Sequence, residues 1–258
     1  MSTVVLDSHR AHTPRQGIAI VGIIGALTLL FAITATLIGG NSQPQPDQFA
    51  VVEVVPTRAN VQLATVPSGA AKADPVWANR VASVTDIGPI AAMAYGTASL
   101  RLANDRPGCK LGWSTLAGIG SIESGHGTND GATLMPDGRT SHPILGPALD
   151  GSGDMASIPS DSESIIWHGD GRWDRAVGPM QFIPSTWKRW GTDASGDGVA
   201  DPNNIADAAF TAGLYLCASG ADLTTGSGWS RAVFSYNHSD DYVRKVLAQA
   251  NAYTAAVR

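Results

Sequence analysis

The sequence predicts a mainly helical domain that follows one membrane-spanning helix. Near the N-terminus, residues 17–38 contain no charged residue. Farther on, apolar residues recur at helical spacing in several segments separated by Gly and Pro. The chain has 258 residues, which is enough for one good-sized domain with appendages. Its formal net charge of -5 argues against bulk electrostatic binding to nucleic acid or to anionic lipid.

The apolar stretch from Gly17 to Ile38 is long enough to cross a bilayer as a helix. Arg10 and Arg15 precede it, and Asp47 is the first charge after it. Because positive flanks stay in the cytoplasm, we predict a cytoplasmic tail over 1–16, a transmembrane signal anchor over 17–40, and an extracytoplasmic remainder on the cell-wall side of the membrane. A cleaved signal peptide is the alternative, but its apolar region is normally shorter and no clear small-residue cleavage site is present.

Residues 41–75 are predicted to be an extracytoplasmic linker. The first of them, NSQPQPD, are polar and rich in Pro. A loosely alternating stretch from Phe49 to Val66 could form a strand, but Pro56 interrupts it, so a linker is the better interpretation. The composition becomes that of a folded domain at about Pro75, and we assign 76–258 to the domain.

Within the domain, helical spacing predicts a helix from about Ile87 to Leu102 that ends before Arg106. Further helices are expected over 113–124, 185–190, 205–218, 229–236 and from Ser239 onward, where Ser239 is a good N-cap. The region from Thr128 to Trp173 is rich in Gly, Pro and Asp, and no regular structure is assigned to it. A loop this long inside a domain is usually functional or poorly ordered.

Glu123 lies in the last turn of the helix expected over 113–124, since Gly125 is a typical helix stop. The negative end of the helix dipole and burial against apolar neighbours both favour the neutral carboxyl. A carboxyl that is protonated near neutral pH can act as a general acid. The alternative is a solvated residue at a helix end. The apolar stripe of this helix consists of Trp113, Leu116, Ile119 and Ile122.

Three short stretches combine polar and apolar residues at helix edges. They are Glu123-Ser124-Gly125, the segment GPMQF at 178–182, and Ser235-Tyr236-Asn237. Taken singly, each is explained by local packing or capping. Their order along the chain is the more informative feature.

In that order the motifs resemble those of the lytic murein transglycosylases, which have a lysozyme-like fold. The similarity is closer to the membrane-bound lytic transglycosylase B family, through the stretches IESGHG, AVGPMQFIPSTW and SYNHSDDYV. The resemblance covers about 87–253 and implies a compact member with a lysozyme-like catalytic domain. It implies that Glu123 is the catalytic acid and base and that Ser124 orients it. The implied substrate-binding residues are Ser124, Met180, Gln181, Phe182, Tyr236 and Asn237.

The resemblance implies cleavage of the β-1,4 bond between N-acetylmuramic acid and N-acetylglucosamine in peptidoglycan glycan strands, leaving 1,6-anhydro ends. A single catalytic carboxylate agrees with this reaction, because a glycoside hydrolase generally needs two. Glu163, Asp161, Asp170 and Asp174 are rival acids that we interpret as solvated loop residues. The alternatives are a hydrolase in which Asp170 or Asp174 places a water, or an inactive membrane-tethered protein that binds glycan or acts as a scaffold.

A second constellation, at 193–207, resembles an EF-hand loop. Asp193, Ser195 and Asp197 stand at positions 1, 3 and 5, and the Val199 carbonyl at position 7. Asn204 replaces the usual Glu at position 12, and the lengthened loop of the resembled family makes Asp207 the last ligand. A structural calcium ion away from the chemistry is therefore expected. An acidic turn without an ion is the alternative.

Cys109 and Cys217 are the two cysteines. In an exported domain they are expected to form one disulfide, and two buried thiols are the alternative. Trp187 and Trp190 are expected to pack in the core rather than on sugar rings. His126 and His238 flank two of the motifs, but no third ligand lies at metal spacing, so zinc is not expected.

Overall fold

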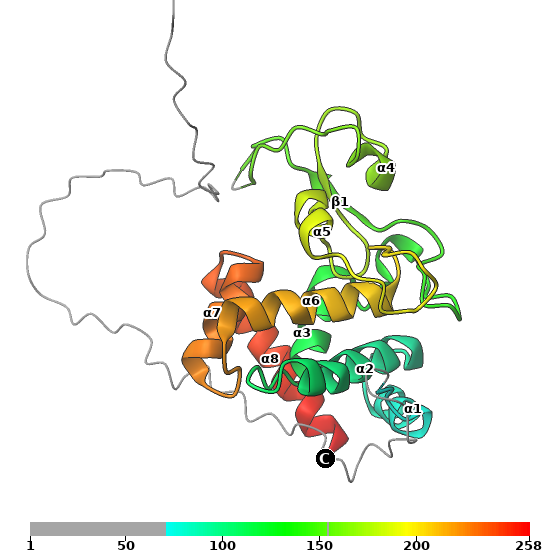
Figure 1. Cartoon of the computed structure of the whole chain (residues 1–258), viewed down its shortest axis with the longest axis vertical. Coiled ribbons are helices and arrows are strands. Elements are labelled where there is room, and N and C mark those ends of the chain that lie inside the picture. Colours follow the sequence, from blue (N-terminus) through cyan, green and yellow to red (C-terminus); the bar gives the residue numbers. More distant parts are fainter. Residues whose placement is uncertain (1–70, 154) are drawn as a thin grey trace, which may run out of the picture. The chain divides into compact units, whose positions relative to one another are not determined.

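The computed structural model describes residues 71–153 and 155–258. Helices dominate these residues, as the sequence predicts (Figure 1). The helices are α1 (Pro75–Val84), α2 (Pro89–Asp105), α3 (Trp113–Ser124), α4 (Ile165–His168), α5 (Pro184–Trp190), α6 (Ile205–Gly220), α7 (Gly226–Tyr236) and α8 (Asp240–Val257). Among the described residues, a 3-10 turn spans Asn129–Gly131, and the strands are β1 (Leu145–Ala148) and β2 (Arg175–Val177).

The helix ends follow local capping chemistry. Gly125 ends α3 in the left-handed conformation at φ 56°, as expected for a glycine stop. The Ser239 side chain accepts a hydrogen bond from the Tyr242 N–H and starts α8, which confirms the predicted N-cap. Asp74 and Asn204 cap α1 and α6 in the same way. These caps determine the residues at which α1, α6 and α8 begin.

The core is built around α3, which packs against α8 and α2. Every residue from Trp113 to Gly120 is buried, so this helix has no polar face. At Gly118 an added Cβ would lie 2.9 Å from the Val246 carbonyl of α8, so only glycine permits this approach of the two helices. The predicted one-sided stripe is therefore wrong in part, because the buried surface runs all round α3 while Ile122 is 38% exposed.

The segment between α3 and α5 contains more regular structure than the sequence predicts. β1 and β2 pair antiparallel, with Leu145 opposite Val177 and Ala148 opposite Arg175. The short helix α4 lies between them in sequence and packs against β2. In Figure 1 this segment, green to yellow, rises on the opposite side of α6 from α1 and α2. Its two short strands are held together by backbone hydrogen bonds, and the Gly- and Pro-rich sequence of the segment gives no pattern that predicts them.

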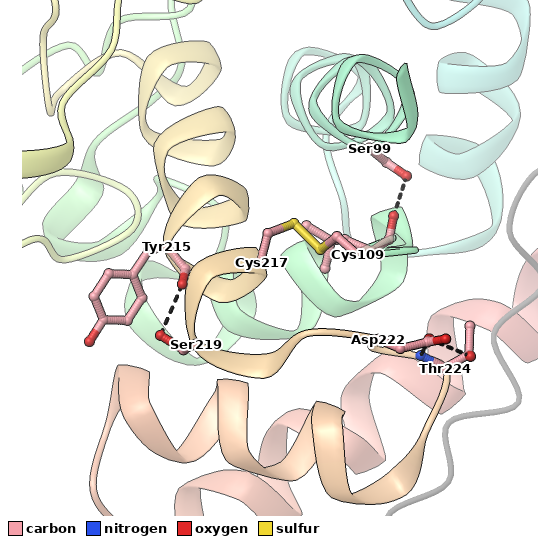
Figure 2. The surroundings of a disulfide bond; sticks show 8 residues. Ser99, Cys109, Tyr215, Cys217, Ser219, Asp222 and Thr224 are labelled. Atoms are coloured by element: carbon pink, nitrogen blue, oxygen red, sulfur yellow. Dashed lines mark hydrogen bonds between the residues drawn. A yellow bond between two sulfur atoms is a disulfide. The ribbon is translucent and has the colours of Figure 1, made fainter. Parts of the chain in front are cut away.

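Cys109 and Cys217 form a disulfide, with a Cα–Cα distance of 5.2 Å and a sequence separation of 108 residues. Figure 2 shows that the bond joins the turn after α2 to the C-terminal half of α6. Next to it, the Ser99 hydroxyl donates to the Leu111 carbonyl. The predicted disulfide is confirmed, and it closes a loop that contains most of the candidate site.

The membrane segment predicted over 17–40, the tail over 1–16 and most of the linker lie outside the described residues. Within the described part of the chain, no helix is both long and apolar enough to span a bilayer. The last residues of the predicted linker belong to the folded domain, because Ala73 is buried and its N–H donates to Thr97 Oγ1. The domain therefore begins a few residues before 76.

Candidate active site

Glu123 occupies the final turn of α3, and Tyr242 of α8 holds its carboxyl group. The Tyr242 hydroxyl donates a hydrogen bond to Glu123 Oε1 at 2.5 Å. Tyr242 is itself buried in the first turn of α8, where Ser239 receives its backbone N–H. On the other side, the turn after α3 is closed by the His126 N–H, which donates to the Gly120 carbonyl. The carboxyl is thus held by a hydroxyl from α8, and the backbone turn that follows it is closed locally.

Burial raises the pKa of Glu123 from its ordinary value of 4.5 to about 7, while the hydrogen bond from Tyr242 acts in the opposite direction. The carboxyl therefore exists in both protonation states near neutral pH. This is the property that a group needs to give up a proton and later recover one. The direction of the shift and the contribution of burial agree with the sequence-based expectation, whereas the contribution of the helix dipole stays a prediction.

The tyrosines beside Glu123 are neutral hydrogen-bond donors. Burial raises the pKa of Tyr242 well above its usual value, and the negative charge of Glu123 adds to the effect. The pKa of Tyr236 is raised in the same way, first by burial and then by Glu123. Neither phenol can compete with Glu123 as an acid near neutral pH.

Ser124 connects α3 to the GPMQF motif at 178–182 rather than to the Glu123 carboxyl. Its buried hydroxyl donates to the Pro179 carbonyl at 2.7 Å and accepts the Gly127 N–H at 2.7 Å. With these two bonds the hydroxyl is engaged on both sides. These bonds go to backbone groups of 127 and 179, and the role of Ser124 in orienting Glu123 stays a prediction.

The 178–182 motif forms a tight turn that the Tyr-Asn motif holds from the opposite side. The Tyr236 hydroxyl donates to the Met180 carbonyl at 2.8 Å, and its ring lies edge-on to Phe182. Gln181 adopts a left-handed backbone with φ 49°. Its side-chain Nε2 donates to the carbonyls of Ile144 and Gly178, so it ties this turn to the segment that leads into β1.

The predicted substrate-binding residues separate into two groups. Met180 and Phe182 are 0% and 3% exposed, so they support the turn from within the core, and their contact with substrate stays a prediction. Tyr236 and Gln181 are partly exposed, and Asn237 is exposed at the end of α7. The structure brings all three motifs together, and the roles of Tyr236, Gln181 and Asn237 toward substrate stay predictions.

Two of the rival acids are engaged in local structure at the surface. Asp161 Oδ1 accepts the backbone N–H groups of Glu163 and Ser164, and these bonds lower its pKa. Glu163 is exposed and forms an ion pair with Lys188 at 2.6 Å. Both are loop residues in contact with solvent, in agreement with the sequence-based interpretation.

The other two rival acids are paired with basic side chains. Asp170 binds Arg175 through a contact of 3.0 Å between Oδ2 and Nη2. Asp174 is only 4% exposed, and its Oδ1 lies 3.3 Å from His168 Nε2. Because the Asp170 N–H donates to Nδ1 of His168, Nε2 carries the proton and donates to Asp174. The interpretation of Asp174 as a solvated loop acid is therefore wrong.

His126 is a buried structural residue. Its Nδ1 lies 3.1 Å from the Tyr95 hydroxyl and its Nε2 lies 2.7 Å from the Tyr253 hydroxyl. Burial lowers its pKa to about 4, so the ring is neutral near pH 7. It bridges two tyrosines of α2 and α8 directly behind the turn that follows Glu123.

The donors of the 193–207 loop do not fit the predicted calcium site. Both oxygens of Asp207 are occupied, because they accept the backbone N–H groups of residues 194, 195 and 201. Asp193 likewise accepts the N–H groups of 196 and 198. Calcium requires six to eight oxygen ligands directed at one point. Among residues 71–153 and 155–258, no group of three or more His, Cys, Asp or Glu could hold a metal ion. The predicted ligands Asp193, Ser195, Asp197, Val199 and Asp207 are thus not assembled around an ion.

Tyr242 is the functional residue that sequence reasoning missed. Its spacing with Val246, Ala250 and Tyr253 marks it as a residue on the buried side of α8. The available signal was the Ser239 cap, which places Tyr242 in the first helical turn, where a hydroxyl can reach past the helix end. Its contact with Glu123 joins residues 119 positions apart.

Comparison with known proteins bears on the second and third motifs. Residues 167–250 match the family model described as "Transglycosylase SLT domain". The match is to a transglycosylase domain. It confirms the predicted resemblance over a region that contains the 178–182 and 235–237 motifs, while Glu123 lies N-terminal to it. No curated protein sequence matches the chain.

Solved structures of lytic transglycosylases are also similar to the chain. The Escherichia coli lytic transglycosylase Slt35 in complex with bulgecin A has a TM-score of 0.40 at 14% identity, over 70% of this chain and 78% of that chain. A second structure of Slt35, in complex with calcium, has the same score over 70% and 79%. SltB3 from Pseudomonas aeruginosa, in complex with NAG-anhNAM-pentapeptide, has a TM-score of 0.38 at 17% identity, over 83% and 76%.

Proposed function

We propose that this chain is a lytic murein transglycosylase that cleaves the bond between N-acetylmuramic acid and N-acetylglucosamine and leaves 1,6-anhydro-muramyl ends. The observation that carries the proposal is the Glu123 carboxyl, which has a pKa of about 7 and is held by Tyr242. The transglycosylase domain match over 167–250 supports it, as does the convergence of the three motifs. We assign the described residues to a lysozyme-like catalytic domain on the same grounds.

In the first step, protonated Glu123 donates its proton to the glycosidic oxygen as the bond to the anomeric carbon breaks. Tyr242 donates to Oε1, which makes Oε1 the acceptor oxygen and leaves the acidic proton on Oε2. As the proton leaves, the bond from Tyr242 stabilises the carboxylate that forms. Tyr242 therefore partly offsets the burial that keeps Glu123 protonated before the reaction.

In the second step, the 6-hydroxyl of the muramic acid residue attacks its own anomeric carbon. Glu123, now a carboxylate, accepts the proton of that hydroxyl, and the 1,6-anhydro ring closes. No water and no second carboxylate take part, and Glu123 returns to its starting state. The pairing of Asp170 with Arg175 and of Asp174 with His168 fits a reaction that does not use these acids.

Tyr236 and Gln181 are proposed to contact the saccharide near the cleaved bond, with Asn237 beside them. Because the Tyr236 hydroxyl and the Gln181 amide N–H groups already donate to backbone carbonyls, the capacity that remains is that of two acceptors, the Tyr236 hydroxyl oxygen and Gln181 Oε1. Sugar hydroxyl groups are donors that match this capacity. Asn237, exposed at the end of α7, would supply both a donor and an acceptor.

We propose that the domain acts on the cell-wall side of the membrane, anchored through residues 17–38. The proposal rests on the charge-free stretch and on the arginines before it. The disulfide between Cys109 and Cys217 is consistent with an oxidising compartment. Calcium is not included in the proposed function, because the donors of the 193–207 loop do not fit it.

The test is digestion of purified peptidoglycan by the full chain in detergent, followed by mass spectrometry of the new glycan ends. Glu123→Gln should abolish cleavage, while Glu163→Gln, which removes an exposed carboxyl elsewhere, should retain it. Anhydro-muramyl ends that depend on Glu123 support the proposal. Reducing ends would instead indicate a hydrolase, and glycan binding without cleavage by the wild type would indicate a scaffold protein.

A further inference from the structure

The Arg139 side chain lies against the 193–207 loop, at the place where the spacing of the loop residues predicts a bound cation. Its Nη2 donates to Asp197 Oδ2 at 3.0 Å, and its Nε lies 3.5 Å from Asp201 Oδ2. These two carboxylates occupy positions 5 and 9 of the EF-hand numbering, counted from Asp193. One guanidinium group therefore bridges two carboxylates of the loop.

The backbone around Arg139 is fixed against the end of the same loop. The segment folds back through a bridge between Leu134 and Thr140, and Arg139 itself forms a bridge with Asn204. Two further backbone bonds run from 140 to 203 and from 205 to 138. At Gly138 an added Cβ would lie 2.7 Å from Asn204 Oδ1, so glycine permits this contact. The backbone that carries the Arg139 guanidinium is thus fixed by these bonds.

Asn204, at the position of the usual bidentate Glu, is also committed elsewhere. It is 1% exposed, its Oδ1 caps α6 by accepting the Ala206 N–H, and its Nδ2 donates to the Asp137 carbonyl. Asp207 is the residue expected to bind calcium in place of that Glu, but both of its carboxylate oxygens accept backbone N–H groups of the loop. The two residues that would complete a calcium shell instead join the loop to α6 and to the segment before β1.

We propose that Arg139 supplies, from within the chain, the positive charge that an EF-hand-type loop takes from calcium. Without a cation, the carboxylates of Asp197 and Asp201 repel each other. A guanidinium offers several donors in a rigid fork and keeps its charge at all relevant pH values, so it can satisfy both. The consequence is a domain that is indifferent to calcium, in which residues 134–140 are held to the start of α6 by charge as well as by backbone bonds. The inference is independent of the proposed enzymatic function.

Thermal unfolding of the full chain in detergent, with EGTA or with about 1 mM calcium, tests the proposal. The wild type should unfold at the same temperature in both. Arg139→Gln should lower the Tm in EGTA by about 2–4 °C, and calcium should not restore that loss, because Asn204 and Asp207 keep their other partners. Arg139→Lys keeps the charge and should remain indifferent to calcium. The matched control is Arg244→Gln, which removes an exposed arginine paired with Asp241 on α8 and should leave the Tm in EGTA unchanged.

Three results would overturn the proposal. The first is a wild-type Tm that rises with calcium, which needs no variant to observe. The second is an Arg139→Gln variant that keeps the wild-type Tm in EGTA. The third is an Arg139→Gln variant whose lost stability calcium restores, because the loop would then still bind the ion that its donors are argued not to fit. If Arg139→Gln does not fold, the same comparison is made with Asp197→Asn, which should lose stability in EGTA and remain unresponsive to calcium; a calcium response there would also contradict the proposal.

Discussion

Replacement of Glu123 by Gln should stabilise the folded protein while it abolishes cleavage. The carboxyl has a pKa of about 7 in the folded state against an ordinary value of 4.5. The folded state therefore retains a proton that the unfolded chain releases, and the stability of the wild type falls as the pH rises between these two values. Gln cannot ionise, so it avoids this cost, and its side-chain oxygen can still accept the hydrogen bond from Tyr242.

The two pKa values set the size of the effect. At a pH of about 8 the wild type pays nearly the full cost of ionising a buried carboxyl, roughly 3 kcal/mol. At a pH of about 5 the cost is only about 1 kcal/mol, because this pH lies only slightly above the pKa at which the unfolded chain releases the proton. The advantage of Glu123→Gln over the wild type should therefore grow by roughly 2 kcal/mol across this range.

Urea denaturation followed by tryptophan fluorescence, at both pH values, measures this difference. Glu163→Gln controls for the loss of one negative charge, since Glu163 is an exposed carboxyl outside the candidate site. If the stability difference between Glu123→Gln and the wild type is the same at both pH values, Glu123 does not hold a proton in the folded state and the proposed acid is lost. A destabilised variant at high pH would contradict the reasoning more strongly.

Three further changes test the contacts around Glu123 and the frame that holds them. Tyr242→Phe removes the hydrogen bond that lowers the pKa of Glu123. The alkaline limb of the profile of kcat/KM against pH should therefore move to higher pH, and kcat should fall roughly tenfold. An unchanged profile would contradict the role assigned to Tyr242. Ser124→Ala leaves two buried backbone groups unsatisfied and should cost about 1–3 kcal/mol in urea denaturation, whereas a neutral effect would mean that the link to the Met-Gln turn is dispensable. Paired replacement of Cys109 and Cys217 by Ser should lower the free energy of unfolding by about 2–5 kcal/mol, and equal stability of the two proteins would show that the closed loop contributes nothing.

Local chemistry was sufficient to predict most of the helices and the position of Glu123. Gly125 has only one common role at the end of an apolar helix, and Ser239 followed by two acidic residues is a strong helix start. The helices at α6 and α7 were found within a few residues of their ends for the same reason. Two helices of the described residues were missed: α1, which precedes the first helix expected from spacing, and α4, which lies in the Gly- and Pro-rich region from Thr128 to Trp173.

The strands and the contacts of the site depend on residues distant in sequence. β1 has four residues and β2 has three, and their pairing rests on backbone groups that no side-chain pattern encodes. Tyr242 reads as a core residue until the packing of α8 on α3 brings its hydroxyl to Glu123. Ser124 similarly reads as a partner of its neighbour, although its hydroxyl bonds a carbonyl 55 positions away.

The acidic loop shows how spacing alone can mislead. The positions of Asp193, Ser195 and Asp197 are those of a calcium loop, and the sequence gives no sign that Arg139 lies opposite them. The backbone N–H groups that occupy Asp207 are equally invisible, because they belong to the fold of the loop itself. The interpretation of Asp174 as a solvated acid was wrong because its partner, His168, could not be identified from spacing.

Digestion of peptidoglycan in water enriched in oxygen-18 tests the central claim most directly. If the 6-hydroxyl of the sugar attacks the anomeric carbon and Glu123 is the only carboxyl involved, the new muramyl ends carry no label and lack one water relative to reducing ends. Mass spectrometry of the released fragments distinguishes the two products. An oxygen-18 atom at the new muramyl end, formed by the wild type and absent with Glu123→Gln, would show that water is the nucleophile and would contradict the proposed mechanism.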